Sequence, residues 1–121
     1  MVVLSHLCLL LAAASAAGVV RRYSELEGRP YSIARDGRSL LVNGSRVLLL
    51  SGSIHYPRST PAMWPKLFAE ARANGLNAIE SYAFWNKHSA TRDGAYDYGF
   101  NGDVSLFLSL AAEHDLFVLW R

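Results

Sequence analysis

Residues 47–58, which read VLLLSGSIHYPR, decide how this chain is expected to fold. The stretch opens on four consecutive apolar residues, and apolar residues at consecutive positions are typical of a strand covered on both faces in a parallel sheet. Residues 47–54 are therefore predicted to form one buried strand. His55, Tyr56 and Arg58 follow it, so we expect polar side chains at the edge where the core ends.

Two glycine-containing turns precede this strand. Asp36-Gly37 and Asn43-Gly44 lie after the short runs 32–35 and 39–42. Both dipeptides accept positive φ angles at low cost, which makes them strong signals for two-residue hairpins. The sequence therefore predicts a short antiparallel meander whose last strand continues into residues 47–54.

A helix is predicted after the strand. Thr60 is placed to cap it, and Pro61 suits the first helical position, where its missing N–H would be unpaired anyway. Asn74-Gly75 predicts the end of the helix. The expected buried stripe, at helical spacing, consists of Met63, Trp64, Leu67, Phe68 and Ala71.

The rest of the chain repeats the pattern. Residues 76–82 predict a second strand, 83–102 a loop, 103–114 a second helix and 116–120 a third strand. Such alternation implies right-handed crossovers and a parallel sheet. No G-x-G-x-x-G turn follows the first strand, which argues against a dinucleotide-binding fold.

A (β/α)₈ barrel, the TIM barrel, accounts for this α/β pattern better. In that fold, polar residues at the carboxyl ends of the strands line the active site. A complete barrel needs about 250 residues and eight strands, whereas this chain has 121 residues. We therefore expect an incomplete barrel, made of about the first three strands and two helices.

The first 17 residues have the features of a cleaved signal peptide. A compact apolar core precedes Ala14-Ser15-Ala16, which matches the small-x-small cleavage rule. The alternative, a membrane anchor, needs roughly 20 apolar residues, and this run is shorter, so no stable membrane span is expected. Cys8, the single cysteine, lies in this segment. The rest of the chain, in which residues 23–121 are assigned to the incomplete barrel domain, would then enter the secretory pathway, bound for the cell exterior, cell wall, vacuole or lysosome.

The charge of the chain gives little sign of a nucleic-acid partner. The formal net charge is +2, and the basic residues are scattered rather than gathered in a stripe with aromatic residues. Binding to nucleic acid is therefore not expected.

The predicted strand ends gather aromatic, hydroxyl, amide and charged side chains. This mixture suits a sugar, whose C–H face packs on aromatic rings and whose hydroxyls need directional hydrogen bonds. The residues concerned are His55, Tyr56, Arg58, Glu80, Tyr82, Trp85, Asn86, His88 and Arg121.

Some of these residues also have simpler interpretations. His55 can be a hydrogen-bonded structural histidine, and Trp85 can be a core residue. A metal held by His55 and His88 is not expected, because no third Asp, Glu or His lies at ligand spacing. No cofactor is implied.

Glu80 is the least easily explained as a structural residue. A carboxylate within a barrel strand is costly to bury unless it is paired. Arg121, on the adjacent predicted strand, is the expected partner, and Arg58 is the second choice. We hypothesise a contact between Glu80 and Arg121.

A pair of catalytic carboxylates is not apparent. Retaining glycoside hydrolysis needs two, about 5 Å apart. Asp93, Asp97 and Asp103 fall in the predicted loop and at a helix start, where turn and cap roles are expected. No catalytic residue is therefore assigned within this chain.

Residues 32–121 closely resemble the amino-terminal part of glycoside hydrolase family 35, the β-galactosidases of plant and lysosomal type. The resemblance rests on uncommon residues in fixed order. They are Ser51-Gly52-Ser53-Ile54-His55-Tyr56, Arg58, Met63-Trp64-Pro65, Gly75-Leu76-Asn77, Tyr82 and Phe84-Trp85-Asn86.

The resemblance implies a barrel enzyme that removes terminal non-reducing β-galactosyl residues with retention of configuration. It also implies that Tyr82 contacts the galactose. In the family, a Cys-Ala-Glu-Trp motif follows the position of Arg121, and the acid/base and nucleophile glutamates lie on later strands. The 121 residues alone are therefore expected to be inactive.

Three departures from the family pattern stand out. Glu80-Ser81 replaces Gln-Thr, His88-Ser89-Ala90 replaces His-Glu-Pro, and Leu119-Trp120-Arg121 replaces a His-Leu-Arg run. They leave two alternatives open: a degenerate paralogue or truncated product that at most binds sugar, and a related barrel glycosidase such as a β-glucosaminidase.

Overall fold

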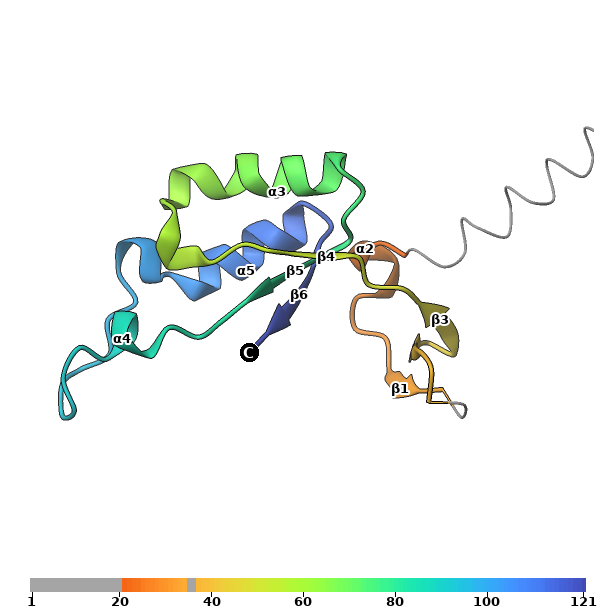
Figure 1. Cartoon of the computed structure of the whole chain (residues 1–121), viewed down its shortest axis with the longest axis horizontal. Coiled ribbons are helices and arrows are strands. Elements are labelled where there is room, and N and C mark those ends of the chain that lie inside the picture. Colours follow the sequence, from red (N-terminus) through yellow and green to blue (C-terminus); the bar gives the residue numbers. More distant parts are fainter. Residues whose placement is uncertain (1–20, 35–36) are drawn as a thin grey trace, which may run out of the picture. The chain divides into compact units, whose positions relative to one another are not determined.

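The computed structural model describes residues 21–34 and 37–121. These residues belong to two compact units, divided between Leu49 and Leu50 (Figure 1). The predicted signal peptide and Asp36 lie outside the described residues, so the signal peptide and the secretory route stay predictions. No helix in the described part of the chain has the length and hydropathy that a bilayer crossing requires.

The first unit contains the predicted antiparallel meander. Its elements are helix α2 (Tyr23–Leu26) and strands β1 (Tyr31–Ile33), β2 (Leu40–Val42) and β3 (Ser45–Val47). The strands pair antiparallel in the order β1-β2-β3. Asn43 and Gly44, with φ angles of 49° and 75°, form the two-residue turn between β2 and β3, as the Asn-Gly signal predicts.

The second unit is built on three parallel strands. They are β4 (Ser51–Ser53), β5 (Ala78–Ser81) and β6 (Phe117–Trp120), hydrogen-bonded in the order β4-β5-β6. Helix α3 (Trp64–Ala73) joins the first two strands, and helix α5 (Val104–Glu113) joins the last two. Shorter elements are helix α4 (Trp85–His88) and the 3₁₀ turns Tyr56–Arg58, Pro61–Met63 and Phe100–Gly102.

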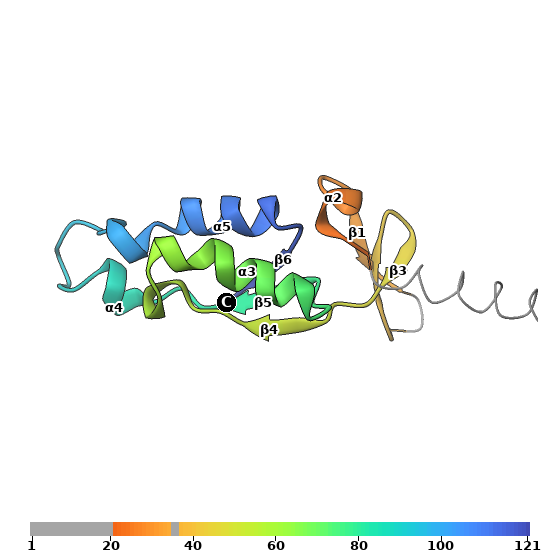
Figure 2. The ribbon, with the colours of Figure 1, turned by 90° about the horizontal axis from the view of Figure 1, so that it is seen from above.

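The alternation predicted from the sequence is therefore confirmed at the level of element order. Figures 1 and 2 show α3 and α5 along the same side of the three strands. Within the described residues the parallel strands form an open sheet, not a closed barrel.

The predicted single strand over residues 47–54 is wrong. Val47 ends β3 and Ser51 begins β4, and the intervening Leu48 and Leu50 are 47% and 40% exposed. The apolar run connects two sheets instead of lying inside one. β4 itself is not buried, since Ser51 and Ser53 are exposed and Gly52 is only partly buried.

The side chain of Asn77 pairs with the backbone just before the parallel ladder between β4 and β5 begins. The amide of Leu50 donates to Asn77 Oδ1 at 2.7 Å, and the amide of Asn77 donates to the Leu50 carbonyl at 3.1 Å. Asn77 is fully buried, where an unpaired amide group would be costly. These two bonds therefore fix how β5 lies along β4 before the first ladder pair, Ser51 with Ala78.

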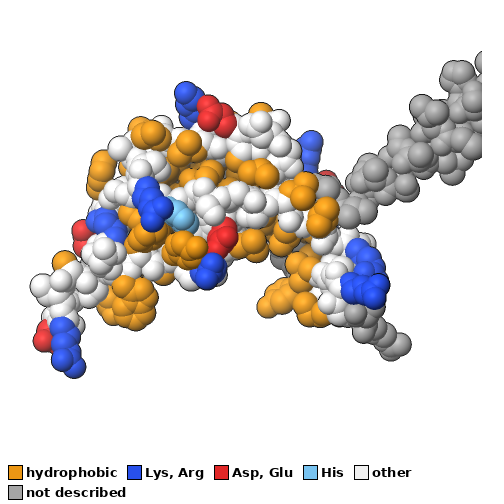
Figure 3. All heavy atoms as spheres, viewed as in Figure 1, with side chains coloured by type: hydrophobic (Ala, Val, Ile, Leu, Met, Phe, Trp, Pro, Cys, Tyr) orange, Lys and Arg blue, Asp and Glu red, His pale blue; other side chains and the backbone are white. Residues whose placement is uncertain are grey.

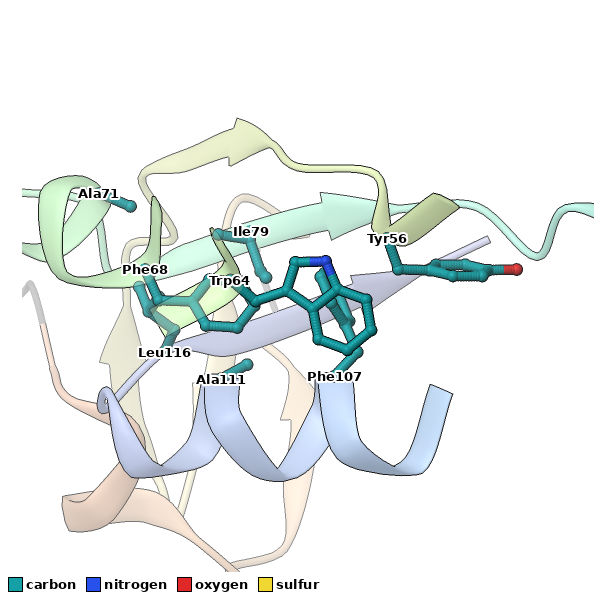
Figure 4. Close-up of a cluster of buried hydrophobic side chains, with 8 residues drawn as sticks. All are labelled: Tyr56, Trp64, Phe68, Ala71, Ile79, Phe107, Ala111 and Leu116. Carbon is teal, nitrogen blue, oxygen red and sulfur yellow. The ribbon is translucent and has the colours of Figure 1, made fainter. Parts of the chain in front are cut away.

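The core of the second unit lies between the helices and one face of the sheet. Figure 4 shows the contributing side chains from α3, α5, β5 and the segments around them. The buried members are Tyr56, Trp64, Phe68, Ala71, Ile79, Phe107, Ala111 and Leu116.

The predicted helix starts differ in detail from the observed ones. Pro61–Met63 is a 3₁₀ turn, Thr60 makes no side-chain cap, and Met63 is half exposed rather than part of the buried stripe. Asp103 does cap α5, since its Oδ1 accepts from the Leu106 amide at 2.9 Å. That bond confirms the cap role expected for Asp103.

Gly75 is expected to be sensitive to substitution. It follows the end of α3 with φ of 88°, and no heavy atom lies within 4 Å of where a Cβ would be placed. Gly75→Ala should lower the free energy of unfolding by about 1–2 kcal/mol through backbone strain alone. Gly75→Asn should cost less, because asparagine accepts this conformation more readily. Urea unfolding of both variants tests this, and an equal cost would contradict it.

Candidate functional site

Polar and aromatic side chains meet at the carboxyl ends of the three parallel strands. His55 follows β4, Glu80 and Tyr82 lie at the end of β5, and Arg121 follows β6. Phe84 joins them from the loop after β5. We call these five residues the mouth cluster.

The hypothesised contact between Glu80 and Arg121 is confirmed. Arg121 Nη1 donates to Glu80 Oε1 at 2.9 Å. The Glu80 hydrogen bond is the main cause that raises the pKa of Arg121, with Tyr82 as the next contributor. Arg58, the second-choice partner, lies instead over the Phe84 ring at 5.6 Å. The Arg121 side chain is 66% exposed, so solvent screens the pair.

Tyr82 is partly exposed and contacts His55, Arg121 and Phe84 of the mouth cluster. Its ring stacks on His55 with centroids 4.8 Å apart, and Arg121 Cζ lies 4.9 Å from its centroid. Arg121 Nη1 also approaches Tyr82 Oη at 3.4 Å. The ring is therefore bounded by a histidine, a guanidinium and the Phe84 ring, which it meets edge-on at 6.1 Å. Its contact with a sugar stays a prediction.

His55 is held by ring contacts. Its Nδ1 is buried and has no hydrogen-bond partner in the described part of the chain. The ring stacks on Tyr82 and meets the Phe84 ring edge-on at 5.5 Å. This differs from the interpretation of His55 as a hydrogen-bonded structural histidine.

The hydrogen-bonded structural histidine is His88. Its Nδ1 lies 2.8 Å from the Asp97 carbonyl, and its Nε2 lies 2.7 Å from Tyr56 Oη. A carbonyl only accepts, so Nδ1 carries the proton and Nε2 accepts from the Tyr56 hydroxyl. The same hydroxyl accepts from the Phe84 amide at 2.9 Å. This buried relay was missed from the sequence and ties the loop to the first parallel strand.

The loop is also fixed through Asp97. Its carboxylate accepts from Lys87 Nζ at 3.0 Å and from the Gly99 amide at 2.7 Å. These bonds, the Gly99 amide first, lower the pKa of Asp97. The turn role expected for Asp97 is confirmed.

An open hollow lies on the loop beside the relay. It has a volume of about 290 Å³ and is lined by Ala83, Trp85, His88, Ser89, Tyr96 and Tyr98. Trp85 is 78% exposed, so it is not the core residue of the alternative interpretation.

Comparison with known families identifies the chain. The model of glycosyl hydrolases family 35 matches residues 39–121. The chain belongs to this family. The match begins within the antiparallel meander and covers the whole second unit, including the mouth cluster.

Relatives of this family 35 chain are named β-galactosidases. It is 46% identical over 95 residues to beta-galactosidase 14 of Arabidopsis thaliana and 45% identical over 89 residues to beta-galactosidase 13 of the same plant. It is 42% identical over 90 residues to probable beta-galactosidase 2 of Dictyostelium discoideum.

These alignments cover most of the chain and little of the relatives. They take in 78%, 74% and 74% of this family 35 chain, and 11%, 10% and 12% of the three relatives. The chain therefore spans about a tenth of the length of these relatives.

The carboxylates of Glu80 and Asp97 are both paired with other groups. The Glu80 carboxylate is engaged with Arg121, and the Asp97 carboxylate with Lys87 and Gly99. Over residues 21–34 and 37–121, no three His, Cys, Asp or Glu side chains form a group that could hold a metal ion. On the face drawn in Figure 3, a histidine lies among hydrophobic side chains close to basic ones.

Proposed function

We propose that residues 50–121 are the opening strands and helices of a (β/α)₈ barrel that hydrolyses terminal, non-reducing β-D-galactosyl residues with retention of configuration. The family match over residues 39–121, with relatives named β-galactosidases, is the observation that carries the proposal. The parallel order β4-β5-β6 supports the barrel, because a TIM barrel begins with such strands.

Tyr82 is the proposed galactose contact in this segment. It lies at the carboxyl end of β5, is 36% exposed, and presents both a ring and a hydroxyl. In TIM barrels, ligands bind at this end of the strands. The ring can pack on a C–H face of the sugar while the hydroxyl forms a directional hydrogen bond.

Hydrolysis needs carboxylates beyond those of this segment. A retaining glycosidase uses an acid/base and a nucleophile about 5 Å apart. The pairing of Glu80 with Arg121 suits a structural or positioning role better than either catalytic role, since a paired carboxylate is a weaker base and nucleophile. The catalytic pair of the proposed enzyme would therefore come from later strands.

The test measures release of p-nitrophenol from p-nitrophenyl β-D-galactopyranoside. The full-length protein that carries this segment should hydrolyse it, and Tyr82→Phe should raise KM about 5- to 20-fold, as loss of one hydrogen bond to a bound sugar would. The 121-residue chain alone should release none.

Assays with two p-nitrophenyl glycosides, together with a galactose-binding measurement, distinguish the β-galactosidase from the related glycosidase and from the degenerate paralogue. Hydrolysis of the N-acetyl-β-glucosaminide but not the β-galactoside would support the related glycosidase. Binding of galactose without hydrolysis would support the degenerate paralogue. Turnover by the 121-residue chain that is abolished by Glu80→Gln would show that Glu80 is the nucleophile and contradict the proposed division of roles.

A further inference from the structure

We propose that Glu80 is a positioning residue: through Arg121, it holds the Tyr82 hydroxyl in the direction needed for the sugar. The inference deepens the proposed function and rests on it. It assigns a task to the carboxylate that neither the family match nor the relatives' names assign.

The backbone places the side chains of Glu80, Tyr82 and Arg121 on one face of the parallel sheet. Glu80 lies in β5 and Tyr82 is the first residue after it, so side chains two residues apart lie on the same face as long as the extended pairing continues. The Arg121 amide donates to the Ser81 carbonyl at 3.0 Å, and the Ala83 amide donates to the Arg121 carbonyl at 2.7 Å. These two bonds flank Tyr82 and place Arg121 directly beside it. The backbones at the site are thus fixed, and only side-chain torsions remain to be set.

Glu80 sets the position of the guanidinium. The bond from Arg121 Nη1 to Glu80 Oε1 is 2.9 Å, whereas the same nitrogen lies 3.4 Å from Tyr82 Oη. The shorter, charge-assisted bond is the stronger one. The Glu80 side chain is 27% exposed against 66% for Arg121, so the carboxylate is the better-anchored partner.

The guanidinium in turn limits the motion of the Tyr82 ring. Arg121 Cζ lies 4.9 Å from the ring centroid, within the range of a cation–π contact. The other neighbours are His55, stacked at 4.8 Å with 21° between the ring planes, and Phe84, which meets the ring edge-on at 6.1 Å. Because Tyr82 is outside the buried core, its position depends on these few contacts, of which Arg121 is the one that also reaches the hydroxyl.

A fixed phenol benefits binding. A hydroxyl that already points toward the sugar loses less rotational freedom when the complex forms. Without Glu80, Arg121 would no longer be held beside the Tyr82 ring. The Tyr82 side chain would then have to be ordered when the sugar binds, and the entropy lost in that ordering would weaken binding. The expected consequence is weaker substrate binding with little change in the chemical step.

The test is a double-mutant cycle between Glu80 and Tyr82 in the full-length protein. Glu80→Ala should raise KM for p-nitrophenyl β-D-galactopyranoside, and the Kd for galactose measured by calorimetry, about 3- to 10-fold. The kcat should change less than about twofold. Glu80→Gln, whose amide oxygen still accepts from Arg121, should restore most of the loss.

The effect of Glu80→Ala on KM is also measured in the Tyr82→Phe variant, to separate positioning of the hydroxyl from a nonspecific disturbance of the site. If Glu80 acts on the hydroxyl, Glu80→Ala should raise KM there by less than half the factor seen with Tyr82 present. The inference would be overturned if Glu80→Ala raised KM in the Tyr82→Phe background by at least half the factor that it causes in the wild-type protein. Glu70→Ala is the matched control, because Glu70 forms an exposed pair with Lys66 at 3.8 Å and should leave KM unchanged.

The outcomes also separate this inference from the proposed function. A wild-type protein that binds galactose and shows no coupling between Glu80 and Tyr82 overturns the inference alone. A wild-type protein that neither binds galactose nor hydrolyses the galactoside overturns both.

Discussion

Trp64→Ala is expected to lower the free energy of unfolding by about 3–5 kcal/mol, the range for removing a large aromatic side chain from a core. Trp64 is fully buried, and its ring meets Phe107 edge-on with centroids 5.2 Å apart. Its Nε1 donates to Ser59 Oγ at 3.1 Å. The substitution therefore opens a cavity between α3 and α5. Urea unfolding followed by circular dichroism measures the loss.

Trp85→Ala supplies the matched control. Trp85 is 78% exposed, and substitution of a surface side chain changes stability by about 0.5 kcal/mol or less. Equal losses for the two tryptophans would show that the core between the helices is not formed as described.

Tyr56→Phe should lower the free energy of unfolding by about 2–4 kcal/mol, although it removes a single oxygen atom. The loss leaves two groups without their partner: the Phe84 amide and His88 Nε2. Figure 4 shows the Tyr56 hydroxyl pointing away from the other core side chains, so the aromatic ring would still fill its place. Faster hydrogen exchange of the Phe84 amide should accompany the loss.

Tyr31→Phe is the control for this change. Tyr31 is 79% exposed, so removal of its hydroxyl should cost about 0.5 kcal/mol or less. A cost for Tyr56→Phe no larger than this would mean that the relay through His88 adds nothing to stability. Non-additivity with His88→Ala would confirm that the two side chains act together.

Features with a local physical cause could be predicted from the sequence. Asn43-Gly44 marks a turn because both residues accept positive φ, and Asp103 caps a helix because its carboxylate reaches a free amide. The Glu80–Arg121 contact could be predicted as well, because strand periodicity places both on one face and an unpaired carboxylate there is costly.

Features that depend on the path of the chain could not be predicted. The relay joins Tyr56 to His88 across 32 residues, and nothing next to either residue indicates the other. The apolar run 47–50 also misled, because four consecutive apolar residues look alike whether they lie inside a sheet or connect two sheets. The exposure of Trp85 could not be predicted either, because the neighbouring residues in the sequence do not show whether the folded chain covers its side chain.

The Asn77 side chain has a consequence for how this segment can change over evolutionary time. Its hydrogen bond to Leu50 fixes the register of β4 and β5 at their amino ends, which is the end of the sheet opposite the mouth cluster. Replacements among ligand-facing positions can then alter what is recognised while the alignment of the scaffold persists. Such a separation lets one architecture try new specificities without refolding.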